Sequence, residues 1–352
     1  MTKFRIVTPD AQYADDAVIE RRTAGPDVAW SIFRERHQTR DRLPDDVLRA
    51  ADAIVVWHEM KIDEAFIARL DNCRVIVRAG VGFDHIDLEA AGRAGLPVCN
   101  TPDYGTSEVA DHAMALMLNF CRGIGSFQNA MMRDPVAGFD STLAPLMRRI
   151  RGTVFGIIGM GRIGTAAALR AKAFGMDVVA YDPYLPRGAE IAIGVQRVES
   201  LADLLGGSDV VSVHCPLTDE TRNMIDAARL SQMRPHTILI NTARGAVVDV
   251  PAAIDALKAG VIAGAALDVL PNEPPNAGDA IAREMRTLAG SDLDGRLIVT
   301  PHAAWASPES RADARRLSTE TAMLYLRSGT LRNLVNADQL KSGRRDWRAP
   351  SG

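Results

Sequence analysis

Three polar residues follow predicted strands in the second half of the chain, and their types suit acid–base chemistry on a small carboxylic acid. Arg244 follows one strand, Glu273 lies in a proline-rich turn after a second, and His302 follows a third. A guanidinium can hold a carboxylate through two parallel N–H bonds. A histidine can take or return a hydroxyl proton while a carboxylate fixes its tautomer. Each residue taken singly also fits a loop or surface role, but the carboxyl ends of parallel strands share one edge of a sheet, so we expect the three to converge.

A glycine-rich segment lies between a predicted strand, 153–158, and a predicted helix, 165–174. Gly159, Gly161 and Gly164 form the pattern GxGxxG. In a dinucleotide-binding turn, the first glycine permits the tight turn, the second lets the backbone approach the pyrophosphate, and the third allows close helix–strand packing. The alternative is that these glycines only form a turn.

Asp182 ends the next predicted strand, 18 residues after Gly164. A carboxylate at this place can accept hydrogen bonds from the adenosine ribose and repel a 2′-phosphate. The spacing therefore favours NAD over NADP, although Arg187 nearby leaves a strict preference open, and Asp182 would alternatively cap the following loop.

Short β-branched segments alternate with helical patterns along the whole chain, which predicts parallel sheets covered by helices. We expect an α/β protein of two doubly wound parallel-sheet domains, with a Rossmann NAD-binding domain (124–306) inserted into a flavodoxin-like substrate domain (1–123 and 307–340) and a frayed tail (341–352). The long helix that starts at Ser107 is assigned to the first domain. The strands are expected at 4–8, 28–33, 53–57, 74–77, 97–100, 153–158, 177–181, 209–214, 237–241, 264–269 and 297–300.

The bulk composition narrows the class of protein. The 352 residues are 47% hydrophobic and 24% charged with a formal net charge of −3, which indicates globular domains and gives no reason to propose nucleic acid or a membrane surface as a partner. The four cysteines have no metal-ligand spacing, so we expect reduced thiols and no metal site. Without a signal-like or membrane-spanning segment, we expect a cytoplasmic protein.

The sequence resembles the D-isomer-specific 2-hydroxyacid dehydrogenase family, in particular the branch of the C-terminal-binding-protein dehydrogenases. The resemblance covers nearly the whole chain and is carried by the segments Arg78–Asp87, Val98–Asn100, Gly159–Gly164, His214–Pro216, Asn241–Gly245, Ala266–Val269, Glu273–Pro274 and Pro301–Trp305. It implies an NAD-dependent oxidoreductase of small 2-hydroxy or 2-oxo acids, usually a homodimer through the cofactor domain, with an active-site cleft between the two domains.

The resemblance also assigns roles to individual residues. It makes Arg244, Glu273 and His302 catalytic, and it places the substrate at Arg78, Val81, Gly82, Arg244 and Trp305. It places the cofactor at Gly159, Gly161, Arg162, Ile163, Gly164, Asp182, Cys215, Pro216, Thr242, Ala243, Asp268 and Val109. For Trp305, a packing role is an equal alternative to a substrate contact, because buried aromatic residues commonly serve packing.

Other features leave function partly open. Glu273 and His302 are 29 residues apart, which suggests an insertion at 276–294 that could act as a lid or a dimer contact. No lysine lies between Gly80 and Phe83, which argues against phosphite-oxidising relatives. The rival class is an NAD(H)-sensing scaffold like the corepressor relatives. Phosphoglycerate, glyoxylate, hydroxypyruvate and longer or aromatic 2-oxo acids all remain candidate substrates.

Overall fold

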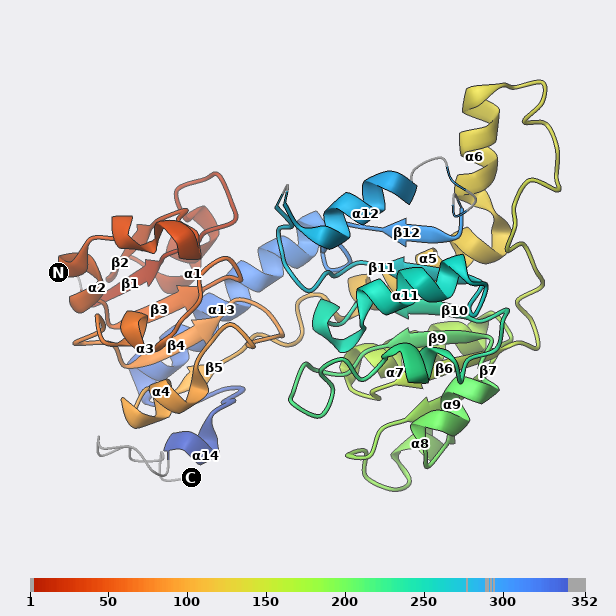
Figure 1. Ribbon diagram of the computed structural model, residues 1–352. Helices are drawn as coiled ribbons and strands as arrows, with labels where there is room; N and C mark the ends of the chain where they lie inside the picture. Colours follow the sequence, from red (N-terminus) through yellow and green to blue (C-terminus); the bar gives the residue numbers. More distant parts are fainter. Residues whose placement is uncertain (1–2, 277, 289–290, 292, 294, 341–352) are drawn as a thin grey trace. The chain divides into compact units, whose positions relative to one another are not determined.

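The computed structural model describes residues 3–276, 278–288, 291, 293 and 295–340. The chain forms two compact units, Met1–Gly105 with Ser307–Gly352, and Thr106–Ala306. The second unit is thus inserted in sequence between the two parts of the first, and each carries its own sheet (Figure 1). None of the described helices combines the length and apolar character needed to cross a membrane.

The first unit is built on a five-stranded, all-parallel sheet in the order β2-β1-β3-β4-β5. Helices α2, α3 and α4 cover one face through a core around Phe66, Leu48 and Ile76, while α13 packs along β3 and β4 and against α1. Its strands are β1 (Phe4–Thr8), β2 (Val28–Ile32), β3 (Ala53–Val56), β4 (Val75–Arg78) and β5 (Val98–Cys99). Its helices are α1 (Val18–Ala24), η1 (His37–Arg42), α2 (Asp45–Arg49), α3 (Glu64–Ile67), α4 (Leu88–Arg93), α13 (Pro308–Ser328) and α14 (Ala337–Leu340).

The second unit is built on a seven-stranded, all-parallel sheet in the order β12-β11-β10-β9-β6-β7-β8. Helices α9, α10 and α11 cover one face, and α5 and α7 cover the other. The strands are β6 (Val154–Ile158), β7 (Asp177–Tyr181), β8 (Gln196–Arg197), β9 (Val210–Val213), β10 (Ile238–Asn241), β11 (Gly264–Leu267) and β12 (Leu297–Val299). The helices are α5 (Thr106–Arg122), α6 (Ile124–Arg133), α7 (Arg162–Ala173), α8 (Ala189–Ile193), α9 (Leu201–Gly207), α10 (Ala227–Leu230), η2 (Gly245–Val247), α11 (Val250–Lys258) and α12 (Ala280–Leu288).

These two strand orders confirm the expected fold class. The first is the flavodoxin-like order, and the second is the Rossmann order with one further strand, β12, at its edge. In the second sheet the strand order reverses at the neighbouring strands β6 and β9. Proteins with open α/β sheets bind ligands at such a point.

Four details differ from the sequence expectations. The helix α5 packs along α7, so the boundary between the units lies after Gly105 instead of after residue 123. The short strand β8 and the helix α6 were not expected, because β8 spans only two residues and α6 lies in a glycine- and proline-containing stretch. The helix α7 begins at Arg162, within the glycine motif. The expected frayed tail lies outside the described residues, as do residues 277, 289–290, 292 and 294 of the suggested insertion.

Local sequence signals explain where several of these helices begin. Asp63, Asp87 and Asp249 each precede a helix and accept a hydrogen bond from a backbone N–H of its first turn. Such capping satisfies N–H groups that have no partner inside the helix. Ser307 does the same for α13 in a reciprocal capping box with Ser310, followed by Pro308 at the first helical position.

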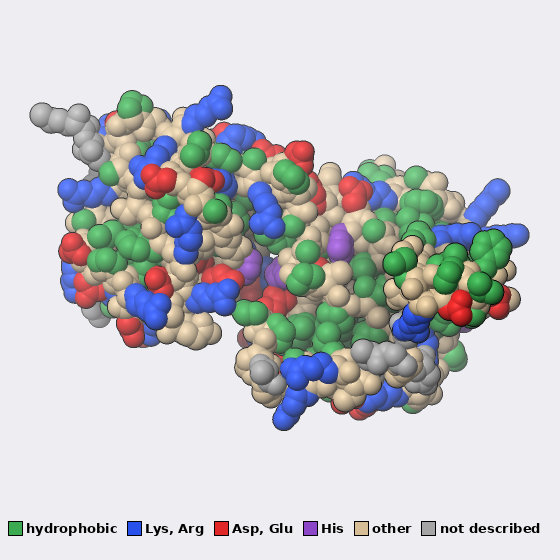
Figure 2. All heavy atoms as spheres, turned by 90° about the horizontal axis from the view of Figure 1, so that it is seen from above, with side chains coloured by type: hydrophobic (Ala, Val, Ile, Leu, Met, Phe, Trp, Pro, Cys, Tyr) green, Lys and Arg blue, Asp and Glu red, His purple; other side chains and the backbone are tan. Residues whose placement is uncertain are grey.

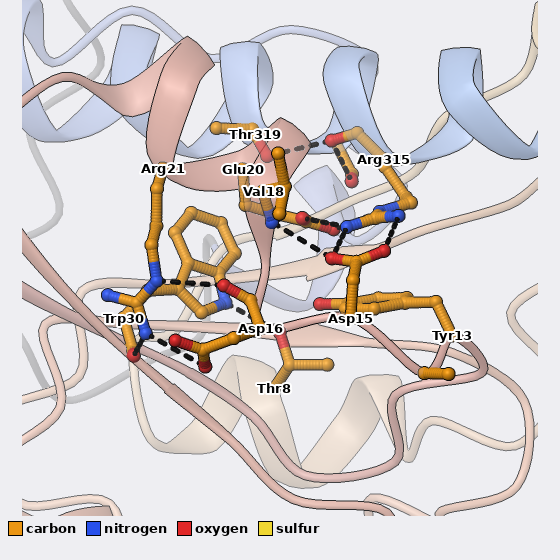
Figure 3. A network of polar contacts seen from close by, with 12 residues as sticks. Thr8, Tyr13, Asp15, Asp16, Val18, Glu20, Arg21, Trp30, Arg315 and Thr319 are labelled. Atoms are coloured by element: carbon orange, nitrogen blue, oxygen red, sulfur yellow. Dashed lines mark hydrogen bonds and ion pairs between the residues drawn. The ribbon is translucent and has the colours of Figure 1, made fainter.

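A buried ion-pair cluster joins the C-terminal helix α13 to the segment that follows β1. Arg315 donates hydrogen bonds of 2.6–2.7 Å to both carboxylate oxygens of Glu20 and to both of Asp15 (Figure 3). Its guanidinium also lies 3.8 Å from the ring centroid of Tyr13. This cluster ties residues some 300 positions apart in sequence into one unit.

Candidate active site

The glycine-rich turn after β6 fits a dinucleotide pyrophosphate. Gly159 has φ +94°, and a Cβ there would lie 2.8 Å from the backbone nitrogen of Cys215. A Cβ on Gly164 would collide with the carbonyl oxygen of Gly159. Gly161 has open space where its Cβ would be, and Arg162 and Ile163 form the first turn of α7, whose N–H groups have no carbonyl partner within the helix. The turn therefore presents a backbone surface that an anion can approach closely.

Asp182 lies directly after β7 and supports this turn. Its Oδ2 accepts a hydrogen bond of 2.8 Å from the backbone N–H of Met160, and its Oδ1 accepts one of 2.9 Å from that of Tyr184. The residue thus caps its own loop, as the alternative in the sequence analysis had it. Because a carboxylate oxygen has two lone pairs, each oxygen can still accept a ribose hydroxyl.

The ends of β9 and β10 complete the surroundings of the turn. Among the described residues, the buried atoms Oγ1 of Thr242 and Nδ1 of His214 have no hydrogen-bond partner. Buried polar atoms without a partner are rare and indicate a ligand or solvent group. Burial raises the pKa of the Cys215 thiol to about 11 and lowers that of His214 to about 4, so both side chains are neutral near pH 7. With the glycine cradle, these atoms show that the residues present fit a dinucleotide.

His302 and Glu273 form a direct contact. Nδ1 of His302 lies 2.6 Å from Oε2 of Glu273, and Oε1 of the same carboxylate accepts a hydrogen bond of 2.7 Å from the backbone N–H of Leu270. An ionised carboxylate can only accept, so Nδ1 of His302 carries the proton in this contact. Both side chains are about 70% buried, with 27% and 29% of their surface exposed.

Asp268 builds the turn that carries His302. Its buried carboxylate accepts hydrogen bonds from the hydroxyl of Thr300 at 2.5 Å and from the backbone N–H groups of Ala303 and Ala304 at 2.9 and 3.0 Å. Its carbonyl oxygen accepts the backbone N–H of His302 at 2.7 Å. This turn holds His302 in the left-handed region, at φ +50°, a conformation that is uncommon for a residue with a side chain. The expectation for Asp268 was a place beside the cofactor, and its role in building this turn is an additional finding.

Arg244 begins a segment that packs closely on the chain before Glu273, and its Nη1 donates to the carbonyl of Ala243 at 2.7 Å. A Cβ on Gly245 would collide with the backbone of Leu270, so glycine lets the segment after β10 lie directly against the segment that leads to Glu273. The buried amide of Asn241 fixes the turn, donating to the carbonyl of Arg244 at 2.9 Å and accepting from the N–H of Ala243 at 3.0 Å. Sequence reasoning missed Asn241; its signal was a polar residue ending an apolar strand.

The remaining predicted residues of the second unit lie on described elements. Val109 is buried in the first turn of α5, and Trp305 is 8% exposed in the turn after His302. The carbonyl of Pro216 accepts a hydrogen bond from the hydroxyl of Thr221. The burial of Trp305 agrees with the packing alternative and leaves little of its ring for a ligand.

In the first unit, Arg78, Val81 and Gly82 lie together at the carboxyl end of β4. Nε of the buried Arg78 donates to the carbonyl of Gly82 at 2.8 Å, and the amide of Asn100 donates to the carbonyl of Val81 at 2.7 Å. A Cβ on Gly80 would collide with the Arg78 guanidinium. The arginine is therefore folded over the loop, where a side chain at position 80 would displace its guanidinium.

Comparison with known proteins agrees with this geometry. Residues 114–304 match the family model described as "D-isomer specific 2-hydroxyacid dehydrogenase, NAD binding domain". The D-3-phosphoglycerate dehydrogenase of Methanocaldococcus jannaschii is 33% identical over 332 residues, which are 94% of this chain and 59% of that protein. The chain thus spans about three fifths of the length of this curated relative.

Solved structures cover the chain almost completely. The D-lactate dehydrogenase of Aquifex aeolicus, complexed with NAD and lactic acid, is 28% identical with a TM-score of 0.80, covering 96% of this chain and 97% of its own. The NADPH-dependent glyoxylate/hydroxypyruvate reductase of Sinorhizobium meliloti, with NADP and malonate, is 28% identical with a TM-score of 0.79 over the same shares. The chain therefore belongs to the D-isomer specific 2-hydroxyacid dehydrogenase family and contains the NAD-binding domain of that family.

Proposed function

We propose that this protein is an NAD-dependent D-2-hydroxyacid dehydrogenase that also works as a 2-oxo acid reductase. The observation that carries the proposal is the 2.6 Å contact between Nδ1 of His302 and Oε2 of Glu273. With Nδ1 bound to Glu273, Nε2 of His302 would be the atom that exchanges the proton with the substrate.

His302, Glu273 and Arg244 have different roles in the proposed reaction. Bound NADH supplies a hydride to C2 of the 2-oxo acid, and NAD accepts it in the reverse direction. His302 gives its Nε2 proton to the oxygen at C2 during reduction and takes it back during oxidation. Glu273 stabilises the charged imidazolium and holds its orientation. Arg244 binds the carboxylate of the acid through its planar fork of donors and polarises the neighbouring carbonyl.

The proposal also covers binding. Val81 and Gly82 would bind the substrate carboxylate through their backbone N–H groups, with Arg78 as a further substrate contact. The cofactor would lie at the glycine turn, at Cys215, Pro216, Thr242, Ala243 and Val109, with Asp268 toward its nicotinamide end. The negative charge of Asp182 favours NAD, because it would repel a 2′-phosphate.

We further propose a homodimer formed through the second unit. Helix α6 has no buried residue, and it and the following loop expose the apolar side chains of Ile124, Met132, Val136 and Phe139. Figure 1 shows α6 extending away from the sheet of its unit, and Figure 2 shows hydrophobic side chains gathered there. Contiguous exposed apolar surface of this kind supports a protein interface.

The test is oxidation of NADH by the purified protein with a panel of 2-oxo acids, with NADPH as the control cofactor. The panel contains hydroxypyruvate, glyoxylate, pyruvate, phosphohydroxypyruvate and longer apolar and aromatic acids. We expect turnover on one class of acid and a preference for NADH. Binding of NADH without turnover on any acid would contradict the proposal and favour an NAD(H)-sensing scaffold.

A further inference from the structure

Asp10 is a buried carboxylate at the carboxyl end of the first unit's sheet that no role described above uses. It lies two residues after β1 and is 1% exposed. Its Oδ1 accepts a hydrogen bond of 2.8 Å from the backbone N–H of Trp57, and its Oδ2 accepts bonds of 3.0 Å from those of Glu59 and Met60. The carboxylate thus ties the end of β1 to the segment that follows its neighbour β3.

The strand end that Asp10 holds lies beside Arg78. Val56, the last residue of β3, pairs with Arg78 of β4. The Arg78 guanidinium lowers the pKa of Asp10 and donates to the carbonyl of Gly82. The hydroxyl of Thr101 donates to the carbonyl of Arg78 at 2.9 Å. Arg78 is therefore bonded to the Val81–Gly82 loop that follows its own strand, and it lies beside the strand end that Asp10 holds.

The anion at Asp10 is costly for the fold. Despite the three N–H donors and Arg78, burial raises the pKa of Asp10 from 3.8 to about 6. The sign of this shift means that the charged form is less favourable in the folded protein than in water. A buried charge that lowers the stability of the fold is typical of a functional residue.

The segment that Asp10 holds is also fixed by its neighbours. The amide of Gln12 lies 3.2 and 3.3 Å from the two ring nitrogens of His58. The ring of Tyr13 meets that of Trp57 edge to face at 6.1 Å, and Tyr13 is itself covered by Arg315 (Figure 3). The ends of β1 and β3 therefore form one rigid support beside Arg78.

We propose that Asp10 is a positioning residue for binding of the substrate acid. It acts through Arg78 and residues 57–60, at the carboxyl end of the sheet, where Val81 and Gly82 also lie. This inference rests on the proposed function, because it takes that end of the sheet to contact the acid. Asp10 does not touch the reacting atoms, so its loss weakens binding of the acid much more than it slows the bound acid's reaction.

The test compares Asp10→Asn with wild type in three measurements. The first is KM and kcat for the acid that wild type reduces. The second is the Kd of oxamate, an unreactive 2-oxo acid analogue, in the presence of NADH. The third is the Kd of NADH alone. The matched control is Asp52→Asn, which removes a carboxylate at the opposite edge of the same sheet, where it accepts from the N–H of Arg5. Asp10→Ser is measured in parallel, so that one folded variant is available.

We expect Asp10→Asn to raise KM and the oxamate Kd at least about tenfold, the loss of one charge-assisted contact. We expect kcat to change less than about threefold and the thermal midpoint to stay within about 4 °C of wild type, a shift of about 1 kcal/mol. The NADH Kd and every constant of Asp52→Asn should match wild type. A folded Asp10 variant with unchanged KM and oxamate Kd overturns the proposal, as does a parallel fall of kcat, NADH binding and thermal midpoint.

These outcomes separate the two proposals. Wild-type protein that binds oxamate but reduces no acid removes the proposed function, while the oxamate Kd of the variants still decides the role of Asp10. Wild-type protein that reduces an acid, with an Asp10→Asn variant that binds it equally well, removes only the role of Asp10. Wild-type protein that neither binds oxamate nor reduces an acid contradicts both.

Discussion

Glu273 uses its two carboxylate oxygens for two different donors, with Oε2 2.6 Å from Nδ1 of His302 and Oε1 2.7 Å from the backbone nitrogen of Leu270. Both oxygens must therefore be acceptors. This requirement fixes the imidazole tautomer, with the proton on Nδ1 of His302. The Leu270 bond also locks the carboxylate, so that it cannot turn away from the imidazole.

Glu273→Gln should lower kcat about 10²- to 10⁴-fold without loss of folding. The Leu270 N–H requires the glutamine carbonyl oxygen, so the amide NH₂ must face His302 and force the opposite tautomer. A wrong tautomer with intact geometry has an effect of this size in other acid–base sites. Steady-state kinetics would measure it, with Glu284→Gln on α12, which pairs with Lys258, as the control. Wild-type kcat in Glu273→Gln would exclude tautomer control.

Arg244→Lys should raise KM for the 2-oxo acid about 10- to 100-fold and leave the Kd of NADH within about twofold. The lysine keeps the charge but loses the planar fork, and one charge-assisted hydrogen bond contributes about 1.5–3 kcal/mol. Kinetics and fluorescence titration with NADH provide the two numbers. Equal losses for acid and NADH would indicate misfolding instead of a lost carboxylate clamp.

Asp182→Asn should increase the ratio of kcat/KM for NADPH to that for NADH at least about tenfold, because removal of a like charge relieves repulsion of the 2′-phosphate. It should also weaken NADH, since an amide cannot accept from both Met160 and Tyr184. The control is Asp177→Asn, an exposed carboxylate at the opposite end of the same strand. An unchanged ratio would mean that Asp182 only caps its loop.

Arg315→Ala should lower the free energy of unfolding of the first unit by about 3–5 kcal/mol, because it leaves the carboxylate of Glu20, 3% exposed, without its cation. Arg316→Ala on the same helix is the control. Arg316 is 44% exposed and pairs with Asp313 and Glu320, so its loss should amount to less than about 1 kcal/mol. Urea unfolding followed by tryptophan fluorescence would measure the loss of unfolding free energy in both variants. Equal losses would contradict the claim that burial makes the Arg315–Glu20 pair important.

The fold and the pairing of His302 with Glu273 could be predicted from the sequence because their signals are local. Apolar strands such as Ala53–Val56 are bounded by polar residues, and Gly159, Gly161 and Gly164 occur in a fixed pattern at a strand end. The end of a parallel strand also places a residue such as His302 at the edge where ligands bind. Pattern and topology together thus predict which residues lie at the ligand-binding ends of the strands without knowledge of any contact.

The supporting contacts could not be predicted, because they depend on side-chain directions. Nothing in the sequence distinguishes Asp268, which builds the turn under His302, from an aspartate that contacts a cofactor. The pairing of Asp10 with N–H groups of residues 57–60 joins positions about 50 residues apart. The grouping of α5 with the second unit likewise follows from its packing on α7, which its amphipathic pattern alone does not specify.

Substitution of His302 tests the proposal that this residue exchanges the proton with the substrate. The measurement is NADH-dependent reduction of the preferred 2-oxo acid by His302→Ala, beside the Kd of NADH and the control His236→Ala, a half-exposed histidine paired with Asp209 in the same unit. We expect kcat of His302→Ala to fall at least about 10²-fold, while the NADH Kd and the control stay at wild-type values. Turnover of His302→Ala within a few-fold of wild type would contradict the proposal, because the proton would then come from another group.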